Sequence, residues 1–140
     1  MIKLDKVKIN NFHKLVKINN INTQLIELIL YTLFLTNHKI YLINFNNNII
    51  GFIIFSYIVK PIYLNKYIID NKYKYLDCDK LIFNEIFRFL KQNKIKKLYC
   101  SHKNIKFINL LKDNDFDYTY TESFGEIYNK FGEYLMLKNI

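Results

Sequence analysis

The most constraining feature of this chain is an apolar strand that passes through a short basic loop directly into an amphipathic helix, at residues 68–82. The strand ends at Ile68 and Ile69, the loop follows at 70–79, and apolar residues recur at helical spacing from Leu81. A junction of this kind directs several backbone N–H groups and the positive end of a helix dipole at one place. Such a place suits a phosphate, so the pattern predicts strand, loop and helix around an anion site.

Length and composition predict one globular domain over residues 1–140, since 51% of the residues are hydrophobic and 24% are charged. Cys78 and Cys100 have no second Cys/His pair at ligand spacing, so we expect neither a disulfide framework nor a metal site. A reduced, cytoplasmic compartment is the simplest interpretation. The apolar run at 49–59 is too short to span a bilayer, and no signal peptide is visible, so we expect no membrane partner.

The spacing of apolar residues predicts the order of the secondary structure. We expect strands at 2–7, 40–45, 49–59, 63–70, 95–100, 116–121 and 134–137, and helices at 12–18, 25–34, 80–93 and 104–113. The asparagines at 46–48 tolerate the left-handed backbone of a tight hairpin. Gly51, inside a strand, marks a bulge or a close backbone approach. The order predicts an α/β or α+β sandwich with a mixed sheet and helices on both faces.

The net charge of +9 favours anionic partners, with nucleic acid among them. The lysines are spread from Lys3 to Lys138, however, and Arg88 is the only arginine, as is typical of an AT-rich genome. We therefore favour a solvated, lysine-rich surface and keep nucleic-acid binding as the alternative. The alternating aromatic residues at 116–120 allow stacking on bases, but ordinary sheet packing is the favoured interpretation.

Four segments resemble, in the correct order, the GNAT superfamily of acyl-CoA-dependent N-acetyltransferases along almost the whole chain. Residues 48–52 (Asn-Ile-Ile-Gly-Phe) resemble the family's "x-hydrophobic-V-G-F" strand start, and 68–70 resemble its central strand. Residues 94–100 resemble the strand after the long helix, and Asn104 with Phe116 twelve residues later resembles the "N…GF" segment. The resemblance implies a mixed, mostly antiparallel central sheet with helices on both faces.

The family's phosphate loop, Q/R-x-x-G-x-G/A, corresponds to Lys-Tyr-Leu-Asp-Cys-Asp at 74–79. Lys74 stands at the basic position, and Asp77 and Asp79 occupy both glycine positions, where they add bulk and negative charge beside a pyrophosphate. The resemblance implies acetyl-CoA as the cofactor, held by Ile68, Ile69, Lys74, Tyr75, Leu76, Asp77, Cys78, Asp79, Lys80 and Asn104.

Two interpretations of the aspartates remain open. Aspartate is among the best helix N-caps, so the simpler one is that Asp79, or Asp77, caps the helix from Lys80 onward. Capping in this way is compatible with lost or reoriented cofactor binding. In the other interpretation the loop is shifted in register, and Lys72, Lys74 and Lys80 supply the positive charge.

The catalytic positions that the resemblance implies are only partly filled. The family commonly places a tyrosine on the helix after the last core strand to protonate the leaving thiolate, and the matching Leu111 cannot donate a proton. The nearest candidates for proton transfer are Tyr67, Tyr99, Cys100 and His102. Tyr67 and His102 are the catalytic candidates: histidine titrates near neutral pH, although a lone loop histidine is more often a surface group. Cys100 has no identifiable base partner and is favoured as a small buried residue.

Three functions remain in competition. The first is acetyl transfer from acetyl-CoA to a primary amine of a protein N-terminus, a small molecule or an aminoacyl-tRNA, by direct attack. Backbone N–H groups near Ile68 and Ile69 would then orient the pantetheine and polarise the thioester carbonyl. The second is a degenerate GNAT fold kept as a binding or scaffolding module, suggested by Asp77, Asp79 and Leu111. The third is a nucleic-acid-binding domain, which predicts steep salt dependence.

Overall fold

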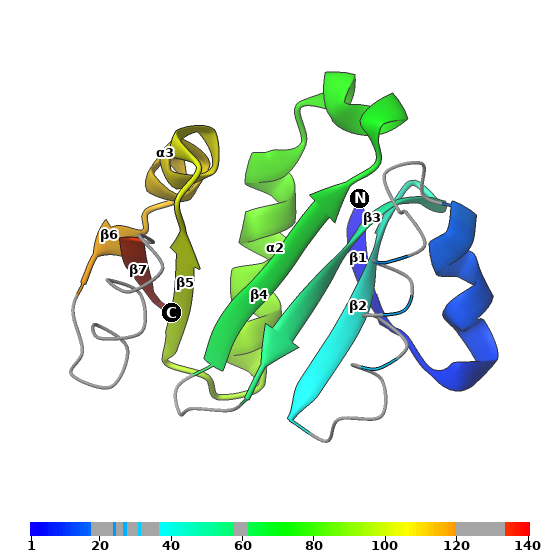
Figure 1. Ribbon diagram of the computed structural model, residues 1–140, viewed down its shortest axis with the longest axis horizontal. Coiled ribbons are helices and arrows are strands. Elements are labelled where there is room, and N and C mark those ends of the chain that lie inside the picture. The colour runs from blue at the N-terminus through cyan, green and yellow to red at the C-terminus, as the bar shows by residue number, and fades with distance from the viewer. Residues whose placement is uncertain (18–23, 25–26, 28–30, 32–36, 58–61, 120–133) are drawn as a thin grey trace.

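The structure is a computed structural model, and it describes residues 1–17, 24, 27, 31, 37–57, 62–119 and 134–140. One seven-stranded sheet has the order β1-β2-β3-β4-β5-β7-β6 (Figure 1). Its strands are β1 (Ile2–Lys6), β2 (His38–Phe45), β3 (Asn48–Ser56), β4 (Ile62–Ile69), β5 (Lys97–His102), β6 (Asp117–Tyr118) and β7 (Tyr134–Asn139). Neighbouring strands are antiparallel except β4 and β5, which are parallel. The predicted α+β class with a mixed, mostly antiparallel sheet is confirmed.

Helices connect several of these strands. Among the described residues are two 3₁₀ helices, η1 (Ile9–Lys17) and η2 (Asn71–Leu76), and two α-helices, α2 (Asp79–Gln92) and α3 (Ile105–Asp113). The helix predicted at 12–18 therefore exists, but it starts earlier and is a 3₁₀ helix. The helix predicted at 25–34 lies largely outside the described residues. The residues of this region that the structure describes, Gln24, Glu27 and Tyr31, are helical.

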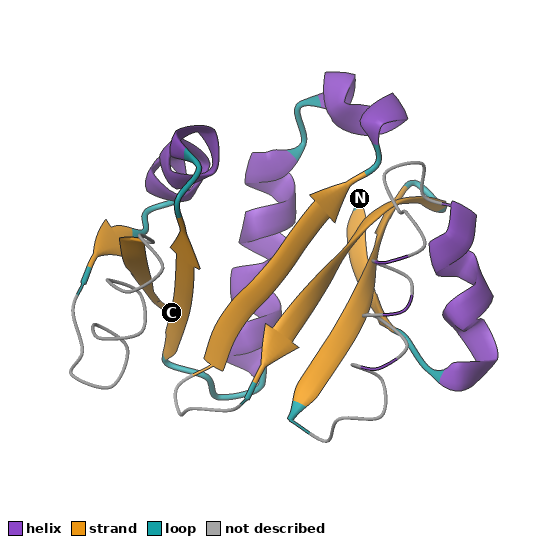
Figure 2. Cartoon of the chain, in the orientation of Figure 1, coloured by secondary structure: helices purple, strands orange, loops and turns teal. Residues whose placement is uncertain are grey.

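The two faces of the sheet bury two different cores, because alternate residues of a strand point to opposite faces. Tyr41 of β2 belongs to the larger core, together with Phe83 of α2 and Ile108 of α3. The preceding residue, Ile40, belongs to the smaller core with Leu15 of η1. Figure 2 shows α2 crossing the sheet on the side away from the viewer. The prediction of helices on both faces is confirmed.

The hairpin between β2 and β3 turns at Asn46 and Asn47, whose φ angles of 49° and 68° lie in the left-handed region. Phe45 pairs with Asn48 across them, so the connection is a two-residue turn. A turn with two left-handed residues matches the natural twist of paired strands, and asparagine tolerates it. The predicted hairpin is confirmed.

Gly51 meets both expectations for a glycine inside a strand. The β2–β3 register shifts between Ile43 and Asn44, next to the pair that Gly51 makes with Ile43. A Cβ atom on Gly51 would lie 2.1 Å from the carbonyl oxygen of Ile68 on β4. Glycine therefore lets the backbones of β3 and β4 approach at this point.

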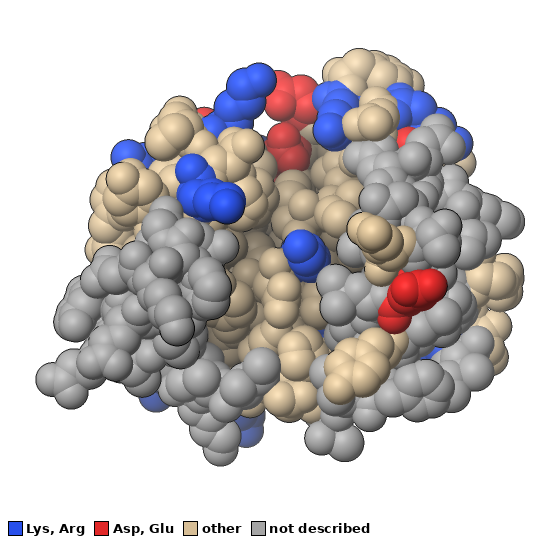
Figure 3. Space-filling view, viewed as in Figure 1, with Lys and Arg blue, Asp and Glu red and all other residues tan. Residues whose placement is uncertain are grey.

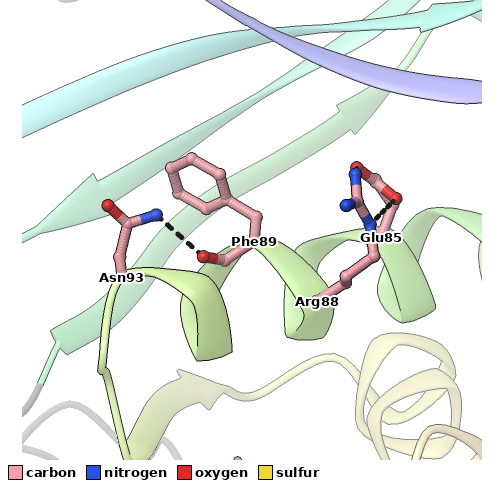
Figure 4. Close-up of polar contacts among 4 residues, drawn as sticks. All are labelled: Glu85, Arg88, Phe89 and Asn93. Carbon is pink, nitrogen blue, oxygen red and sulfur yellow. Dashed lines mark hydrogen bonds and ion pairs between the residues drawn. The ribbon is translucent and has the colours of Figure 1, made fainter.

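Local contacts on α2 fix its outer surface and its end (Figure 4). Arg88 donates a hydrogen bond from Nε to Oε2 of Glu85, one turn earlier, at 2.9 Å. Asn93 donates from Nδ2 to the carbonyl oxygen of Phe89 at 2.8 Å. The same carbonyl also accepts from the backbone N–H of Asn93 at 3.2 Å, so the side chain adds a second hydrogen bond at the end of the helix.

The chain leaves α2 through a left-handed residue that is not glycine. Lys94 has φ 60°, and its N–H donates to the carbonyl of Lys91 at 3.0 Å. The N–H of Ile95 donates back to the carbonyl of Leu90 at 3.0 Å. This pair of bonds is the Schellman arrangement, in which glycine usually takes the left-handed position.

Lys94→Gly is therefore expected to raise the free energy of unfolding by about 1 kcal/mol, because glycine takes this backbone conformation without a steric cost. The melting temperature should rise by about 4 °C in a calorimetric scan. Lys91→Gly is the matched control and should lower stability by about 1 kcal/mol, because glycine is unfavourable inside a helix. A Lys94→Gly variant less stable than the parent would contradict the steric cost assigned to lysine in this left-handed conformation.

The strand predicted at 116–121 is shorter than expected. β6 covers only Asp117 and Tyr118; Tyr118 is 54% exposed, whereas Phe116, just before the strand, is 1% exposed. Residues 120 and 121 lie outside the described residues. Over the part that the structure describes, the alternation of aromatic and polar residues does not produce a half-buried strand, and that prediction is wrong there.

Candidate functional site

The parallel strands β4 and β5 separate after a short stretch of pairing (Figure 1). Their last pair joins Leu64 to Cys100, and no further pair is formed between the rest of β4 and the end of β5. On β3 the consecutive residues Ile54 and Phe55 pair with Lys66 and Leu64 of β4. Asn65, between the last two, is therefore the extra residue of a bulge. A bulge bends its strand. The bent end of β4 and the end of β5 therefore form the two sides of a cleft.

The bulge also decides which side chains of β4 face the helices. Before it, Leu64 pairs with Phe55, and both belong to the core under α2. After it, Tyr67 packs against that core, while Lys66 pairs with Ile54 of the opposite core. Strict alternation from Leu64 would have placed Lys66 against the helices instead. The single extra residue thus brings a tyrosine into the cleft and turns a lysine to the other face.

One cavity of about 570 Å³ lies between the end of β4, η2, the start of α2, and α3. Its described lining is Tyr67, Ile68, Ile69, Tyr73, Lys74, Cys78, Asp79, His102, Asn104, Lys106, Phe107 and Leu110. Both catalytic candidates are in this set. So are six of the ten residues predicted to bind the cofactor: Ile68, Ile69, Lys74, Cys78, Asp79 and Asn104.

The other four predicted cofactor residues are absent from the lining of this cavity. Tyr75 is 78% exposed, Leu76 is the last residue of η2, and Asp77 is the C-cap that follows it. Lys80 donates from Nζ to the carbonyl oxygen of Asp113 at 3.1 Å, which ties α2 to the end of α3. A direct role for these four side chains in cofactor binding stays a prediction without support from the cavity.

Neither aspartate caps α2, so that interpretation of the loop is wrong. The N-cap is Cys78, and it makes no side-chain capping hydrogen bond. Asp77 has φ 48° and ψ 47°, the left-handed conformation. This is a conformation that glycine adopts without steric cost and that aspartate tolerates. The N–H groups of the first turn of α2 consequently have no side-chain cap within the described residues.

Asp79 is the first residue of α2, and its carboxylate accepts a hydrogen bond from a side chain that lines the same cavity. The hydroxyl of Tyr67 donates a hydrogen bond to Oδ1 of Asp79. The ring of Tyr67 lies 5.0 Å from the ring of Phe83 and 6.1 Å from that of Phe107, measured between centroids. The pair therefore joins the bent end of β4 to the start of α2, with the negative charge where a helix dipole favours it.

Burial, followed by the charge of Asp79 and the hydrogen bond to it, raises the pKa of Tyr67 well above its usual range. Tyr67 thus stays neutral, and it is a poor base because its proton is held. Burial, with the nearby Asp79 charge, also raises the pKa of the Cys78 thiol. The described cavity wall therefore presents Cys78 as a neutral thiol rather than as a nucleophile.

His102 and Asn104 are linked in a way that fixes the histidine tautomer. The backbone N–H of Asn104 donates to Nδ1 of His102 at 2.9 Å, so in the neutral ring the proton is assigned to Nε2. The side-chain oxygen of Asn104 caps α3 by accepting from the N–H groups of Lys106 at 2.9 Å and Phe107 at 3.3 Å. In this tautomer Nε2 is the ring nitrogen that can donate a hydrogen bond, while Nδ1 accepts from Asn104.

A second cavity, of about 480 Å³, adjoins the first. Its described lining is Tyr63, Leu64, Asn65, Lys66, Tyr67, Ile68, Cys100, Ser101, His102 and Phe107. The residues common to both cavities are Tyr67, Ile68, His102 and Phe107. The two cavities are therefore neighbours, and both catalytic candidates stand between them.

Hydrogen bonds hold the polar groups of the second cavity. The hydroxyls of Tyr63 and Ser101 are hydrogen-bonded to each other. Asn65 donates from Nδ2 to Oγ of Ser56 at 3.0 Å. Tyr63 pairs with Ser56 on β3, which places this polar group on the face of the sheet opposite α2.

The sequence did not predict the α3 residues that line the first cavity, and the position that matches the family's tyrosine does not line it. Leu111, which matches the family's tyrosine, is fully buried in the core under α2 and lines neither cavity. The α3 side chains that reach the first cavity are Lys106, Phe107 and Leu110. Their spacing puts them on one helix face, so a helix capped at Asn104 could have predicted the set. None of the three carries a hydroxyl.

The charges around the cleft are mixed. Lys74 and Lys106 line the first cavity together with Asp79. Figure 3 shows a hollow on the face turned to the viewer, with acidic and basic side chains gathered at its upper end and one basic side chain within it. Among the described residues, no three His, Cys, Asp or Glu side chains form a metal-binding group. No helix in the described part of the chain has the length and apolar character needed to cross a membrane.

Solved structures resemble this chain over nearly its full length. The N-acetyltransferase PseH of Campylobacter jejuni in complex with acetyl coenzyme A matches with a TM-score of 0.70 and 19% identity, over 99% of each chain. A GNAT family acetyltransferase of Elizabethkingia anophelis with acetyl-CoA bound matches at 0.69 and 15% identity, over 99% of this chain and 98% of the other. The ribosomal-protein-S18-alanine N-acetyltransferase of Escherichia coli matches at 0.71 and 11% identity, over 100% and 94%.

No protein-family model matches the sequence, and neither does any curated protein. The likeness to solved structures is therefore one of fold. It agrees with the resemblance that the short sequence segments suggested, and it places the splayed strands, the loop and α2 in one known architecture.

Proposed function

We propose that this chain, which has the GNAT fold, binds acetyl-CoA in the cleft between β4 and β5 and transfers the acetyl group to a primary amine. The observation that carries the proposal is the cavity that the parting strands open beside the uncapped start of α2. An open helix start, with its N–H groups and positive dipole, suits the diphosphate of coenzyme A. The size of the cavity is in the range of ligand-binding pockets.

The residues present fit such a ligand at most points. Lys74 and Lys106 supply positive charge, and the left-handed Asp77 keeps the turn before α2 without a side chain in the cavity. Beyond Leu64, the backbone of β4 is not paired to β5, so it supports the role predicted for the backbone around Ile68 in orienting the pantetheine and polarising the thioester carbonyl. Asp79 opposes the fit, because its charge competes with the diphosphate.

In the proposed reaction the amine nitrogen attacks the thioester carbonyl carbon, a C–N bond forms, and the C–S bond breaks. The proton that the nitrogen loses ends on the sulfur of the leaving thiol, so the protonation of the chain does not change overall. His102 would donate a hydrogen bond from Nε2 to the reacting group. Tyr67, whose hydroxyl donates to Asp79, would shape the wall of the cleft beside the ligand, where its ring packs against Phe107.

A melting experiment tests the cofactor. Acetyl-CoA at 100 times its dissociation constant should stabilise the native state by about 2.7 kcal/mol, and the melting temperature of the chain should rise by about 10 °C. Release of free thiol from acetyl-CoA in the presence of a mixture of primary amines would then report transfer. A melting temperature unchanged by millimolar acetyl-CoA would sink the proposal.

A GNAT-fold binding module is the second candidate. It is favoured by the carboxylate of Asp79 in the cavity and by the lack of a hydroxyl among the α3 residues that line it. This function predicts stabilisation by coenzyme A with no thiol release from acetyl-CoA. The two readouts of the experiment above therefore separate it from the transferase.

A further inference from the structure

We propose that the second cavity is the acceptor site, and that it takes a primary amine carrying a phosphate or carboxylate group, which Lys66 binds. The inference rests on the proposed transferase function and adds the chemical class of its acceptor. Tyr67, Ile68, His102 and Phe107 line both cavities. An amine held in the second cavity would therefore lie next to a ligand in the first, as direct attack requires.

The positive charge in the lining of the second cavity indicates the chemical class of the acceptor. Lys66 is the one charged side chain among the described residues that line the second cavity. Within the described part of the chain, no carboxylate lies within 4 Å of its ammonium. Lys66 is half-buried beside the apolar Ile54 and Ile68. A charge in such surroundings is less screened than one in open water and favours an oxyanion over a second cation.

The bulge is the second observation, because it is what brings Lys66 to this site. Pairing with Ile54 places Lys66 on the face opposite α2, and this is also the face of Tyr63, which pairs with Ser56. A β4 strand without the extra Asn65 would turn Lys66 away from these groups. The structure thus assembles the cation and a set of neutral hydrogen-bonding groups around one opening.

The neutral groups are suited to holding a small polar molecule. The hydrogen-bonded hydroxyls of Tyr63 and Ser101 and the amide of Asn65 lie in the lining with Lys66. They can orient an acceptor but do not distinguish an anion from a cation. Discrimination falls to Lys66, which repels the second ammonium of a diamine and attracts the oxyanion of a phosphate- or carboxylate-bearing amine.

The test compares two amines that differ only in the oxyanion: O-phosphoethanolamine and ethanolamine, with 1,4-diaminobutane as the cationic competitor. Binding is measured by calorimetry on the full chain, and transfer is measured by thiol release from acetyl-CoA. We expect the parent chain to bind O-phosphoethanolamine at least tenfold more tightly than ethanolamine. It should use O-phosphoethanolamine as acceptor with a correspondingly higher kcat/KM.

Three variants assign the preference to one side chain. Lys66→Gln should weaken O-phosphoethanolamine binding about tenfold and change ethanolamine binding less than twofold, whereas Lys66→Arg should retain the preference. Lys96→Gln removes the same charge from an exposed loop residue outside both cavities. It should leave the preference intact, which separates a local contact from the effect of net charge.

The outcomes for the two proposals differ. Equal binding of the two amines, no binding of O-phosphoethanolamine at roughly 10 mM, or a preference unchanged by Lys66→Gln would each overturn the inference. Thiol release without any preference would retain the transferase and reject the acceptor class. A Lys66-dependent preference in binding, without thiol release from any amine, would reject the transferase and retain an oxyanion-binding cavity.

Discussion

Gly51→Ala is expected to lower the free energy of unfolding by about 3 kcal/mol and the melting temperature by roughly 10 °C. The new Cβ would stand 2.1 Å from the carbonyl oxygen of Ile68 and 3.0 Å from Cα of Ile69. Both atoms belong to the backbone of β4, so no side-chain rotation relieves the contact, and the two strands must move apart. Denaturant unfolding followed by circular dichroism measures the loss.

The same substitution should weaken acetyl-CoA binding in the protein that remains folded. Ile68 and Ile69 line the first cavity, and the displaced strand end would alter the side of the cleft that they form. The matched control is Asn48→Ala, at an exposed position at the start of the same strand, which should change stability by less than about 0.5 kcal/mol. A Gly51→Ala variant as stable as the parent would contradict the close approach of β3 and β4.

Asp79→Asn is expected to tighten acetyl-CoA binding about tenfold to a hundredfold, or about 1–3 kcal/mol. The substitution removes a negative charge from the first residue of α2, where the diphosphate would bind. Asparagine keeps an oxygen that can accept the hydrogen bond from Tyr67, so the shape of the cleft is retained. Without the carboxylate, the pKa of Tyr67 should fall toward its usual range. Titration calorimetry measures the affinity, and ultraviolet absorbance measures the tyrosine.

Asp77→Gly is the control for this prediction. Asp77 does not line the cavity, and its left-handed backbone favours glycine. The variant should be about 1 kcal/mol more stable than the parent, with acetyl-CoA affinity changed less than about twofold. Weaker binding in Asp79→Asn would mean that the carboxylate takes part in holding the ligand, and the obstruction assigned to it would be wrong.

The two aspartates before α2 show where a local sequence preference fails to predict the structure. Sequence preference alone favoured Asp77 or Asp79 as the cap of α2, because aspartate is a good N-cap. The structure puts Cys78 at that position, and Asp79 turns to the hydroxyl of Tyr67 instead. A capping preference of about 1 kcal/mol is small enough that the path of the loop from β4 overrides it.

What the sequence determined by itself was the order of the described strands with η1, α2 and α3, the hairpin at Asn46 and Asn47, and the role of Gly51; the helix η2 lies in a segment predicted as loop. Each follows from a local pattern: the spacing of apolar residues, tolerance of left-handed backbone, or the absence of a side chain. These patterns, with the four segments that resemble the GNAT superfamily, were enough to predict the mixed sheet and the succession of strand, connecting segment and helix at 68–82.

Only the tertiary structure decided which side chains meet in the cleft. The extra Asn65 sends Tyr67 to one face of the sheet and Lys66 to the other, and the backbone N–H of Asn104 fixes the tautomer of His102. Leu111 matches the family's tyrosine in sequence position, yet it points into the core. The reason is that the register between strands and the packing of helices arise from contacts between distant residues, and a shift of one residue reverses the face that a side chain occupies.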